Sequence, residues 1–496
     1  MADQRHGEPV MLAVHEPLLL GLDLGTTNAK AAAYTLQGQL IAAGIATYPT
    51  HYLQAGWAEQ RPADWIAALT EATQALVTAL GPRKHDLVAL GLAAHGPGVV
   101  LVDGQGQPLL ETSPTWQDMR CLAQGKWLID TVGLGWAGQG MPDNSFPPKL
   151  RWIVEHHPAV AKQARYALGI KDFLVHWLTG EFATEPTTTA GGDVWWEPVF
   201  AACDWSLDRL PQIAPAHTVI GRVRAMVAEA VGLSAALPVV MGINDGAAAT
   251  LSMGAIQPGD VVLTLATAGV IRAVLSAPPS PAVRLAHHLF CWPYVDEQWI
   301  VGGQLKAATS ALDWFAQSHS DGATLDTLLA QAAQSPVGSQ GVTFFPYLMG
   351  RGSPHPDAKA TGAFLGLTMN TGRGDLVRAV LESVAYEFRT LLDELVALGH
   401  PCTALRISGG GTRSSLWRQI LADVLARPLV HYSADSTLGA AMMAAVGCGY
   451  YDSMVASVAQ MVHSADTTLA SPDSVVHYAA AYGDYQQQRD QLYPRR

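Results

Sequence analysis

Pro17-Leu18-Leu19-Leu20-Gly21-Leu22-Asp23-Leu24-Gly25-Thr26-Thr27-Asn28-Ala29-Lys30 is the stretch of sequence from which the fold is predicted. Its apolar run is continuous up to Leu22, which predicts a buried strand that ends at Asp23. Residues 30–34 and 40–46, on either side of a short turn, predict a hairpin that continues the same sheet. Apolar residues at helical spacing after Pro62 predict a helix packed on that sheet.

The turn that follows this strand has the residue types that suit the γ-phosphate of MgATP. Asp23 can face a hydrated magnesium ion, which takes few protein ligands. Thr26 and Thr27 can donate hydrogen bonds to phosphate oxygens, and Gly25 lets the backbone approach closely. For this motif alone, a capped turn after a buried strand is an equally frequent explanation. The prediction therefore depends on motifs elsewhere in the chain.

A similar pattern starts again about half a chain later. Residues 260–265 form an apolar run, Ala266-Thr267-Ala268-Gly269 predicts a turn, and residues 270–274 predict the returning strand. We therefore expect two α/β domains that join near residues 255–259, with a ligand between them. The expected division is an N-terminal extension (1–16), a first domain (17–256), a second domain (257–450) and a tail (451–496) that packs as helices on the second domain.

Two further motifs lie at predicted strand ends. Asp245 follows an apolar run within Gly242-Ile243-Asn244-Asp245-Gly246, where small neighbours would let a substrate approach a carboxylate that accepts a proton. Taken alone, this peptide favours the alternative of an Asx turn that caps the next helix, since such turns are common. Gly409-Gly410-Gly411-Thr412-Arg413-Ser414 lies between a strand and a helix, where backbone N–H groups attract a nucleotide phosphate or ribose. A role in packing alone is the alternative.

Composition narrows the class of partner. The formal net charge is −12 without long charged runs, which argues against nucleic acid and against anionic membranes. Five scattered cysteines indicate reduced thiols in a cytoplasmic protein. The first fourteen residues lack the apolar segment of a secretory signal, and no stretch resembles a transmembrane span.

Two stretches late in the chain form a long composite motif: Gly362-Ala363-Phe364-Leu365-Gly366-Leu367 and, seven residues later, Asp375-Leu376-Val377-Arg378-Ala379-Val380-Leu381-Glu382. This motif resembles the C-terminal signature of the FGGY carbohydrate kinase family, and the resemblance is greatest to its xylulokinase branch. Residues 149–156, 178–183 and 345–348 extend the likeness, which covers roughly residues 18–447. Three positions depart from the family pattern: Phe146 replaces a small residue or proline, Ala94 replaces a methionine and Ala266 replaces a glycine.

The resemblance implies a fold and a set of site residues. The fold would be α/β, with two actin/hexokinase-like (ribonuclease H-like) domains and an active-site cleft between them. It also implies that Asp245 is the catalytic base and that Asp23 places Mg²⁺. The expected contacts to ATP or its phosphates are Thr26, Thr27, Thr267, Gly410, Gly411 and Ser414. The expected sugar-binding residues are His95, Gly96, Asp118, Asn244 and Asp245, although Asp118 and Arg120 could instead pair with each other.

The expected activity is transfer of the γ-phosphoryl group of ATP, with Mg²⁺, to a hydroxyl of a ketopentose, with D-xylulose as the first candidate. Gluconate, L-xylulose, a tetritol or a deoxyhexulose are alternative acceptors. An actin-like nucleotide-driven assembly or chaperone protein is an alternative of another class, which would leave Asp245 and His95 without a purpose. The expected partners are ATP and a sugar or polyol, with no nucleic acid and no membrane, and a homodimer is left open.

Overall fold

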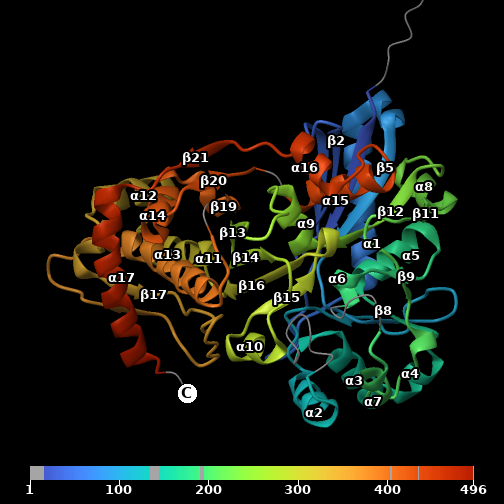
Figure 1. The fold of residues 1–496 in the computed structure, drawn as a ribbon, viewed down its shortest axis with the longest axis horizontal. Helices are drawn as coiled ribbons and strands as arrows, with labels where there is room; N and C mark the ends of the chain where they lie inside the picture. Colours follow the sequence, from blue (N-terminus) through green and yellow to red (C-terminus); the bar gives the residue numbers. More distant parts are fainter. Residues whose placement is uncertain (1–15, 135–143, 190–194, 403–404, 434, 495–496) are drawn as a thin grey trace, which may run out of the picture.

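Two lobes make up the molecule, and each is built on its own mixed β-sheet (Figure 1). The computed structural model describes residues 16–134, 144–189, 195–402, 405–433 and 435–494. All but one residue of the expected N-terminal extension lies outside these ranges. The expected α/β class with two lobes is confirmed.

The first sheet has the strand order β11-β12-β5-β1-β2-β3. Its strands are β1 (Leu18–Leu24), β2 (Asn28–Thr35), β3 (Leu40–Thr47), β5 (Leu87–Ala94), β11 (Val219–Arg222) and β12 (Pro238–Asn244). β1, β5 and β12 run parallel, whereas β2, β3 and β11 are antiparallel to their neighbours. β1 is buried along its whole length, as its continuous apolar run predicts.

The second sheet repeats this plan in the order β15-β16-β14-β13-β19-β20-β21. Its strands are β13 (Val261–Leu265), β14 (Gly269–Leu275), β15 (Phe290–Pro293), β16 (Trp299–Leu305), β19 (Leu405–Ser408), β20 (Leu429–His431) and β21 (Asp466–Thr468). β13, β14 and β16 form an antiparallel meander like β1, β2 and β3, and β19 and β20 run parallel to β13. The predicted repeat of strand, turn and strand is thus real.

Helices cover both sheets. Those of the first half are α1 (Pro62–Leu80), α2 (Leu122–Val132), α3 (Phe146–His156), α4 (Pro158–Gln163), α5 (Ile170–Thr179), α6 (Pro186–Thr189), α7 (Glu197–Ala202), α8 (Ala225–Val231) and α9 (Asp245–Ser252). Those of the second half are α10 (Pro281–Ala286), α11 (Thr309–His319), α12 (Leu325–Gln334), α13 (Arg373–Ala397), α14 (Ser415–Leu425), α15 (Ser436–Gly447), α16 (Met454–Met461) and α17 (Pro472–Leu492). Among the helices of the described ranges, none is long and apolar enough to cross a membrane.

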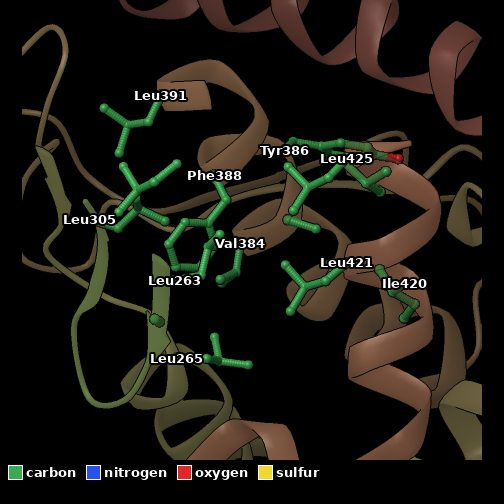
Figure 2. Close-up of a cluster of buried hydrophobic side chains, with 14 of the residues drawn as sticks. Leu263, Leu265, Leu305, Val384, Tyr386, Phe388, Leu391, Ile420, Leu421 and Leu425 are labelled. Atoms are coloured by element: carbon green, nitrogen blue, oxygen red, sulfur yellow. The ribbon is translucent and has the colours of Figure 1, made fainter. Parts of the chain in front are cut away.

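The core of the second lobe lies between its sheet and two long helices. Figure 2 shows Leu263 and Leu305 of the sheet facing Phe388 of α13, with Leu421 of α14 beside them. All four side chains are at most 4% exposed. This packing holds the end of β13, and hence the turn at Thr267, in a fixed place relative to α13.

Helix α15 lies on the first sheet although it follows β20 of the second. It is buried along almost its whole length and packs on β1, β5, β12 and α9. The chain therefore passes from the first sheet to the second after α9, returns to the first sheet at α15 and crosses again before β21. By packing, α15 belongs to the first lobe.

The tail differs from the expected all-helical tail on the second domain. α17 does pack on α14 of the second lobe. However, β21 is a strand that extends the second sheet beside β20. Met454 and Met461 of α16 belong to the apolar cluster that contains Leu19 and Tyr34 of the first sheet. A three-residue strand such as β21 is defined by its partner strand rather than by its own pattern.

We predict that Gly91→Ala in β5 destabilises the protein by about 1–3 kcal/mol, the usual cost of overfilling a packed core. A Cβ at this position would lie 1.9 Å from the carbonyl oxygen of Ala440 in α15. Urea denaturation would measure the loss. Gly104→Ala is the matched control, because Gly104 is exposed and a Cβ there would have no neighbour within 4 Å. Equal stability of the two variants would contradict the close packing of α15.

Candidate active site

Three parallel strands of the first sheet end at the same edge. Leu24 of β1 pairs with Ala94 of β5, which pairs in turn with Asn244 of β12. Asp23 precedes this level by one residue, and His95 and Asp245 follow it by one residue. Strand spacing puts β1 and β12 roughly 10 Å apart, with β5 between them. The fold thus brings together the two predicted carboxylates and the predicted histidine.

Asp23 is 3% exposed and has one bonded and one unbonded oxygen. Ser436 at the start of α15 donates a hydrogen bond of 2.5 Å to Oδ2. Oδ1 is buried and has no hydrogen-bond partner within the described ranges. Burial raises the pKa of Asp23 to about 7, against the opposing effect of Lys30, and the negative charge of Asp245 adds to the rise. The two acids therefore interact electrostatically.

Lys30 of β2 brings a positive charge close to the carboxylates of this site. Its Nζ donates to Oδ2 of Asp435 over 2.9 Å. Burial opposes its charge, but Asp435 and then Asp23 and Asp245 raise its pKa above the usual value. Asp435 is the N-cap of α15 and accepts hydrogen bonds from the backbone and the hydroxyl of Thr437. Lys30 thereby ties the segment before α15 to β2.

Asp245 is the first residue of α9 and is half-buried. Its Oδ1 accepts a hydrogen bond of 2.7 Å from the backbone N–H of Gly246. Asn244 caps the helix, since its Oδ1 accepts from the N–H groups of Gly246 and Ala247. Burial raises the pKa of Asp245, and the opposing charge of Arg272 is the largest effect that lowers it. Both the predicted acid and the alternative helix cap are thus present, on adjacent residues.

His95 is 2% exposed and its protonation can be assigned from its neighbours. The amide nitrogen of Gln60 donates to the Thr26 carbonyl and to Thr50, so its oxygen must be the acceptor for Trp65 Nε1. His95 Nε2 lies 3.1 Å from the same oxygen and is therefore the protonated nitrogen. Nδ1 is left as a buried acceptor that nothing in the described chain satisfies. Burial lowers the pKa of His95 to about 4, so the ring stays neutral.

Asp118 is fully buried and engaged by protein donors. Arg120 donates to both of its oxygens, over 2.8 and 2.6 Å, and Ala58 N–H donates over 2.7 Å. Arg120 also pairs with Glu59 at 2.6 Å and lies over the ring of Trp57. These contacts favour the structural alternative for Asp118 over sugar binding. Gly96, which follows His95, is half-buried with open space where a Cβ would stand.

The predicted phosphate loop after β1 is held by side chains from other segments. Thr26 Oγ1 accepts a hydrogen bond of 2.8 Å from Trp116 Nε1, which leaves the hydroxyl hydrogen of Thr26 free to donate. Thr27 is exposed, and its carbonyl accepts from the N–H of Tyr48. Tyr48 donates its own hydroxyl to the Gly25 carbonyl. The loop is thus rigid in its backbone and accessible at Thr27.

The second lobe brings two predicted nucleotide-binding segments together at the end of β13. Thr267 is exposed in the turn before β14, and its carbonyl accepts hydrogen bonds from Ala308 N–H and the Ser310 hydroxyl. The loop after β19 packs on the same end, because a Cβ on Gly411 would lie 2.6 Å from the side chain of Leu265. Gly410 faces open space, whereas Ser414 is used as the N-cap of α14.

Sequence reasoning missed four residues of this site: Gln60, Arg272, Asp435 and Ser436. Arg272 had a visible signal, because it is the only charge in the otherwise apolar strand β14. Gln60, Asp435 and Ser436 have no local signal for a role in this site. The site residues that they contact, which are His95, Lys30 and Asp23 respectively, lie 35 or more residues away in the chain.

Comparisons with known proteins relate both halves of this chain to one family. The N-terminal domain model of the FGGY family of carbohydrate kinases matches residues 18–252, and the C-terminal domain model matches residues 272–448. The xylulose kinase of Escherichia coli (strain K12) is 33% identical over 462 residues, which cover 90% of this chain and 93% of that protein. The gluconokinase of Bacillus subtilis (strain 168) is 27% identical over 485 residues, which cover 93% of each chain.

Solved structures show the same likeness along the whole chain. The xylulose kinase from Rhodospirillum rubrum superposes with a TM-score of 0.85 at 30% identity, covering 96% of this chain and 99% of that one. The gluconate kinase from Lactobacillus acidophilus has a TM-score of 0.86 at 23% identity, covering 96% and 98%, and supports the fold alone.

We predict that His95→Gln makes the protein less sensitive to acid. The pKa of His95 falls from 6.5 in the unfolded chain to about 4 in the folded chain, so only the unfolded chain takes up a proton between these values. Stability from this group is therefore complete above pH 6.5 and decreases as the pH falls toward 4. Between about pH 7 and pH 5 the wild type should lose about 2 kcal/mol more than the variant. Urea denaturation at both pH values measures this, and parallel losses would contradict it.

Proposed function

The chain belongs to the FGGY family of carbohydrate kinases, and on that premise we propose that it transfers the γ-phosphoryl group of ATP to a hydroxyl of the ketopentose D-xylulose. Its family makes it an ATP-dependent sugar kinase. The choice of D-xylulose is supported by the xylulose kinases at 33% and 34% identity among its relatives. Gluconokinases, at 27% and 26%, make gluconate the first alternative.

One observation carries the proposed mechanism: Asp23 and Asp245 stand at the ends of two strands on either side of β5, and the negative charge of Asp245 contributes to the raised pKa of Asp23. Asp245 is proposed as the base that orients the acceptor hydroxyl and takes its proton late in the transfer. Its position at the start of α9 favours the ionised form, as does the N–H of Gly246.

The residues around Asp23 fit a hydrated magnesium ion. Ser436 fixes one oxygen of this carboxylate, and the other is buried without a partner in the described ranges. Magnesium usually keeps several waters and takes one or two carboxylates. When bound, the ion shields the charge of the β- and γ-phosphates. The hydroxyl groups of Thr26, Thr27 and Thr267 are proposed to donate to phosphate oxygens, with Gly410 and Gly411 along the nucleotide.

His95 is proposed as a contact for a hydroxyl of the sugar. Its Nδ1 is a buried acceptor that has no partner among the described residues, and the hydrogen bond between Nε2 and Gln60 holds the ring in place. Gly96 and Asn244 lie at the same strand ends, so they border the proposed sugar site. Asp118 is proposed to act indirectly, by holding Arg120 and the segment at Ala58.

Two lobes that close on the substrates would exclude water, which limits wasteful hydrolysis of ATP. Membership of a family of carbohydrate kinases leaves the actin-like assembly or chaperone protein without support. We place the proposed reaction in the cytoplasm because the five scattered cysteines indicate reduced thiols. The formal charge of −12 argues against nucleic acid or an anionic membrane as a partner.

We predict that Asp245→Ala lowers kcat for sugar phosphorylation by roughly 10²- to 10⁴-fold, the usual contribution of a general base. MgATP binding, measured by calorimetry, should survive. Asp130→Ala is the control, because Asp130 is 58% exposed and its one ion-pair partner within the described ranges is the exposed Lys126. Turnover of Asp245→Ala close to that of the wild type would refute the assigned base.

A coupled assay of ADP release tests the substrate. The panel would contain D-xylulose, L-xylulose, gluconate, a tetritol and a deoxyhexulose. We expect D-xylulose to give the highest kcat/KM and ADP release to require an added acceptor. A higher kcat/KM with gluconate would overturn the assignment of D-xylulose and leave the kinase activity standing. ADP release that ignores every acceptor would contradict the sugar kinase itself.

A further inference from the structure

Arg272 is a charged side chain in an otherwise apolar strand. β14 reads Gly-Val-Ile-Arg-Ala-Val-Leu, and side chains alternate between its two faces. Ile271 and Ala273 belong to the core of the second lobe. Val274, which shares a face with Arg272, belongs to the apolar cluster that also contains Leu19 and Val240 of the first lobe. Arg272 therefore stands on the face of the second sheet that is turned toward the first lobe.

This guanidinium is buried and incompletely bonded. Arg272 is 8% exposed, and one terminal nitrogen donates to the Thr264 hydroxyl over 3.0 Å. Its Nε is buried and has no partner in the part of the chain that the structure describes. Burial lowers the pKa of Arg272 to about 10, and the charge of Asp245 is the main effect that opposes this fall. A buried cation requires a nearby negative charge to offset the loss of hydration.

The group that faces Arg272 is the start of α9. A Cβ on Gly246 would lie 3.4 Å from both Nε and a terminal nitrogen of Arg272, so the guanidinium lies against the first turn of this helix. A cation at the positive end of a helix is unfavourable unless an anion is present. Asp245, the first residue of α9, supplies that anion from the first lobe.

Arg406 provides a comparison within the same sheet. Arg272 and Arg406 pair with Val262 from opposite sides, so all three side chains share one face. Arg406 has its own carboxylate, Asp260, at 2.6 Å. Among the described residues, Arg272 forms no such direct ion pair, and the main nearby charge that favours its protonated form is that of Asp245. The first-lobe cation Lys30 is bonded to Asp435 and so is already paired.

We propose that Arg272 is a positioning residue for phosphoryl transfer, which balances the charge of Asp245 from the opposite lobe so that the carboxylate and the γ-phosphoryl group, both anionic, can approach each other. This inference rests on the proposed function. The second lobe would then act on the proposed base Asp245, in addition to its proposed role in binding the nucleotide. Nothing in the local sequence around Asp245 indicates this partner, because it lies on another sheet.

The kinetic test compares Arg272→Gln, Arg272→Lys and Arg406→Gln with the wild type. Arg272→Gln should lower kcat by about 10- to 100-fold, in line with the effect of one opposite charge on a neighbouring acid. The KM for the sugar and the Kd for MgATP should stay near the wild-type values. Arg272→Lys keeps the charge and should recover much of the loss, and Arg406→Gln should leave kcat unchanged. A loss in Arg272→Gln that appears only in KM, or that Arg272→Lys fails to recover, would overturn the proposal.

A second test needs no turnover. Thermal unfolding of Asp245→Asn, Arg272→Gln and the double variant forms a double-mutant cycle. Each single change leaves one buried charge without its partner, so the double variant should melt at a higher temperature than the sum of the single shifts predicts. Additive shifts would overturn the coupling. Should Arg272→Gln fail to fold, Thr264→Val removes the hydroxyl that holds the guanidinium, and a smaller fall in kcat is expected. Unchanged kcat there would also overturn the proposal.

The two proposals can fail separately. If the wild type phosphorylates a sugar but the melting-temperature shifts of the double-mutant cycle are additive, the role of Arg272 is refuted and the sugar kinase activity is not. A wild type that phosphorylates no acceptor removes the proposed function and, with it, the role of Arg272 in transfer.

Discussion

The parallel pairing of β5 with β1 on one side and with β12 on the other is the constraint on which the site depends. Because parallel strands end at a common edge, three unrelated segments deliver their last residues to the same level. Asp23, His95 and Asp245 lie within one residue of that level. A shift of register by one residue would turn each of these side chains to the opposite face of the sheet. The chemistry therefore depends on backbone hydrogen bonds as much as on the side chains themselves.

Charge balance around these strand ends involves both lobes. Three carboxylates (Asp23, Asp245 and Asp435) and two cations (Lys30 and Arg272) influence one another. Burial raises the pKa of Asp23 to about 7, so this carboxylate is only partly ionised at neutral pH. With all three carboxylates ionised, three negative and two positive charges leave an excess of one negative charge, which suits a bound hydrated dication. Since Arg272 comes from the second sheet, the balance holds only while the two sheets are close together. The distance between the two lobes therefore affects the charge state of the proposed base, Asp245.

Local patterns predicted the two strand ends well, because an apolar run that stops at a carboxylate is visible within ten residues, as at Leu18–Asp23. The two lobes followed from the repetition of this pattern. Contacts between distant segments could not be predicted in this way. Ser436 and Asp23 are 413 residues apart, and the sequence around either residue gives no indication of the hydrogen bond between them. α15 is apolar on all sides, which indicates a buried helix but not the sheet on which it lies. The strand β21 was missed for the same reason.

The three crossings of the chain between the lobes have a consequence for how the molecule can be divided. A protease that cut the exposed loop near Gln257 would leave the fragments associated, because α15 and α16 of the C-terminal fragment complete the core of the N-terminal one. Neither fragment would have a full hydrophobic interior if it were produced alone. In this chain the two matched regions, residues 18–252 and 272–448, therefore share one hydrophobic cluster. Synthesis on the ribosome must almost finish before the first sheet acquires the helix that covers its β1–β5 face.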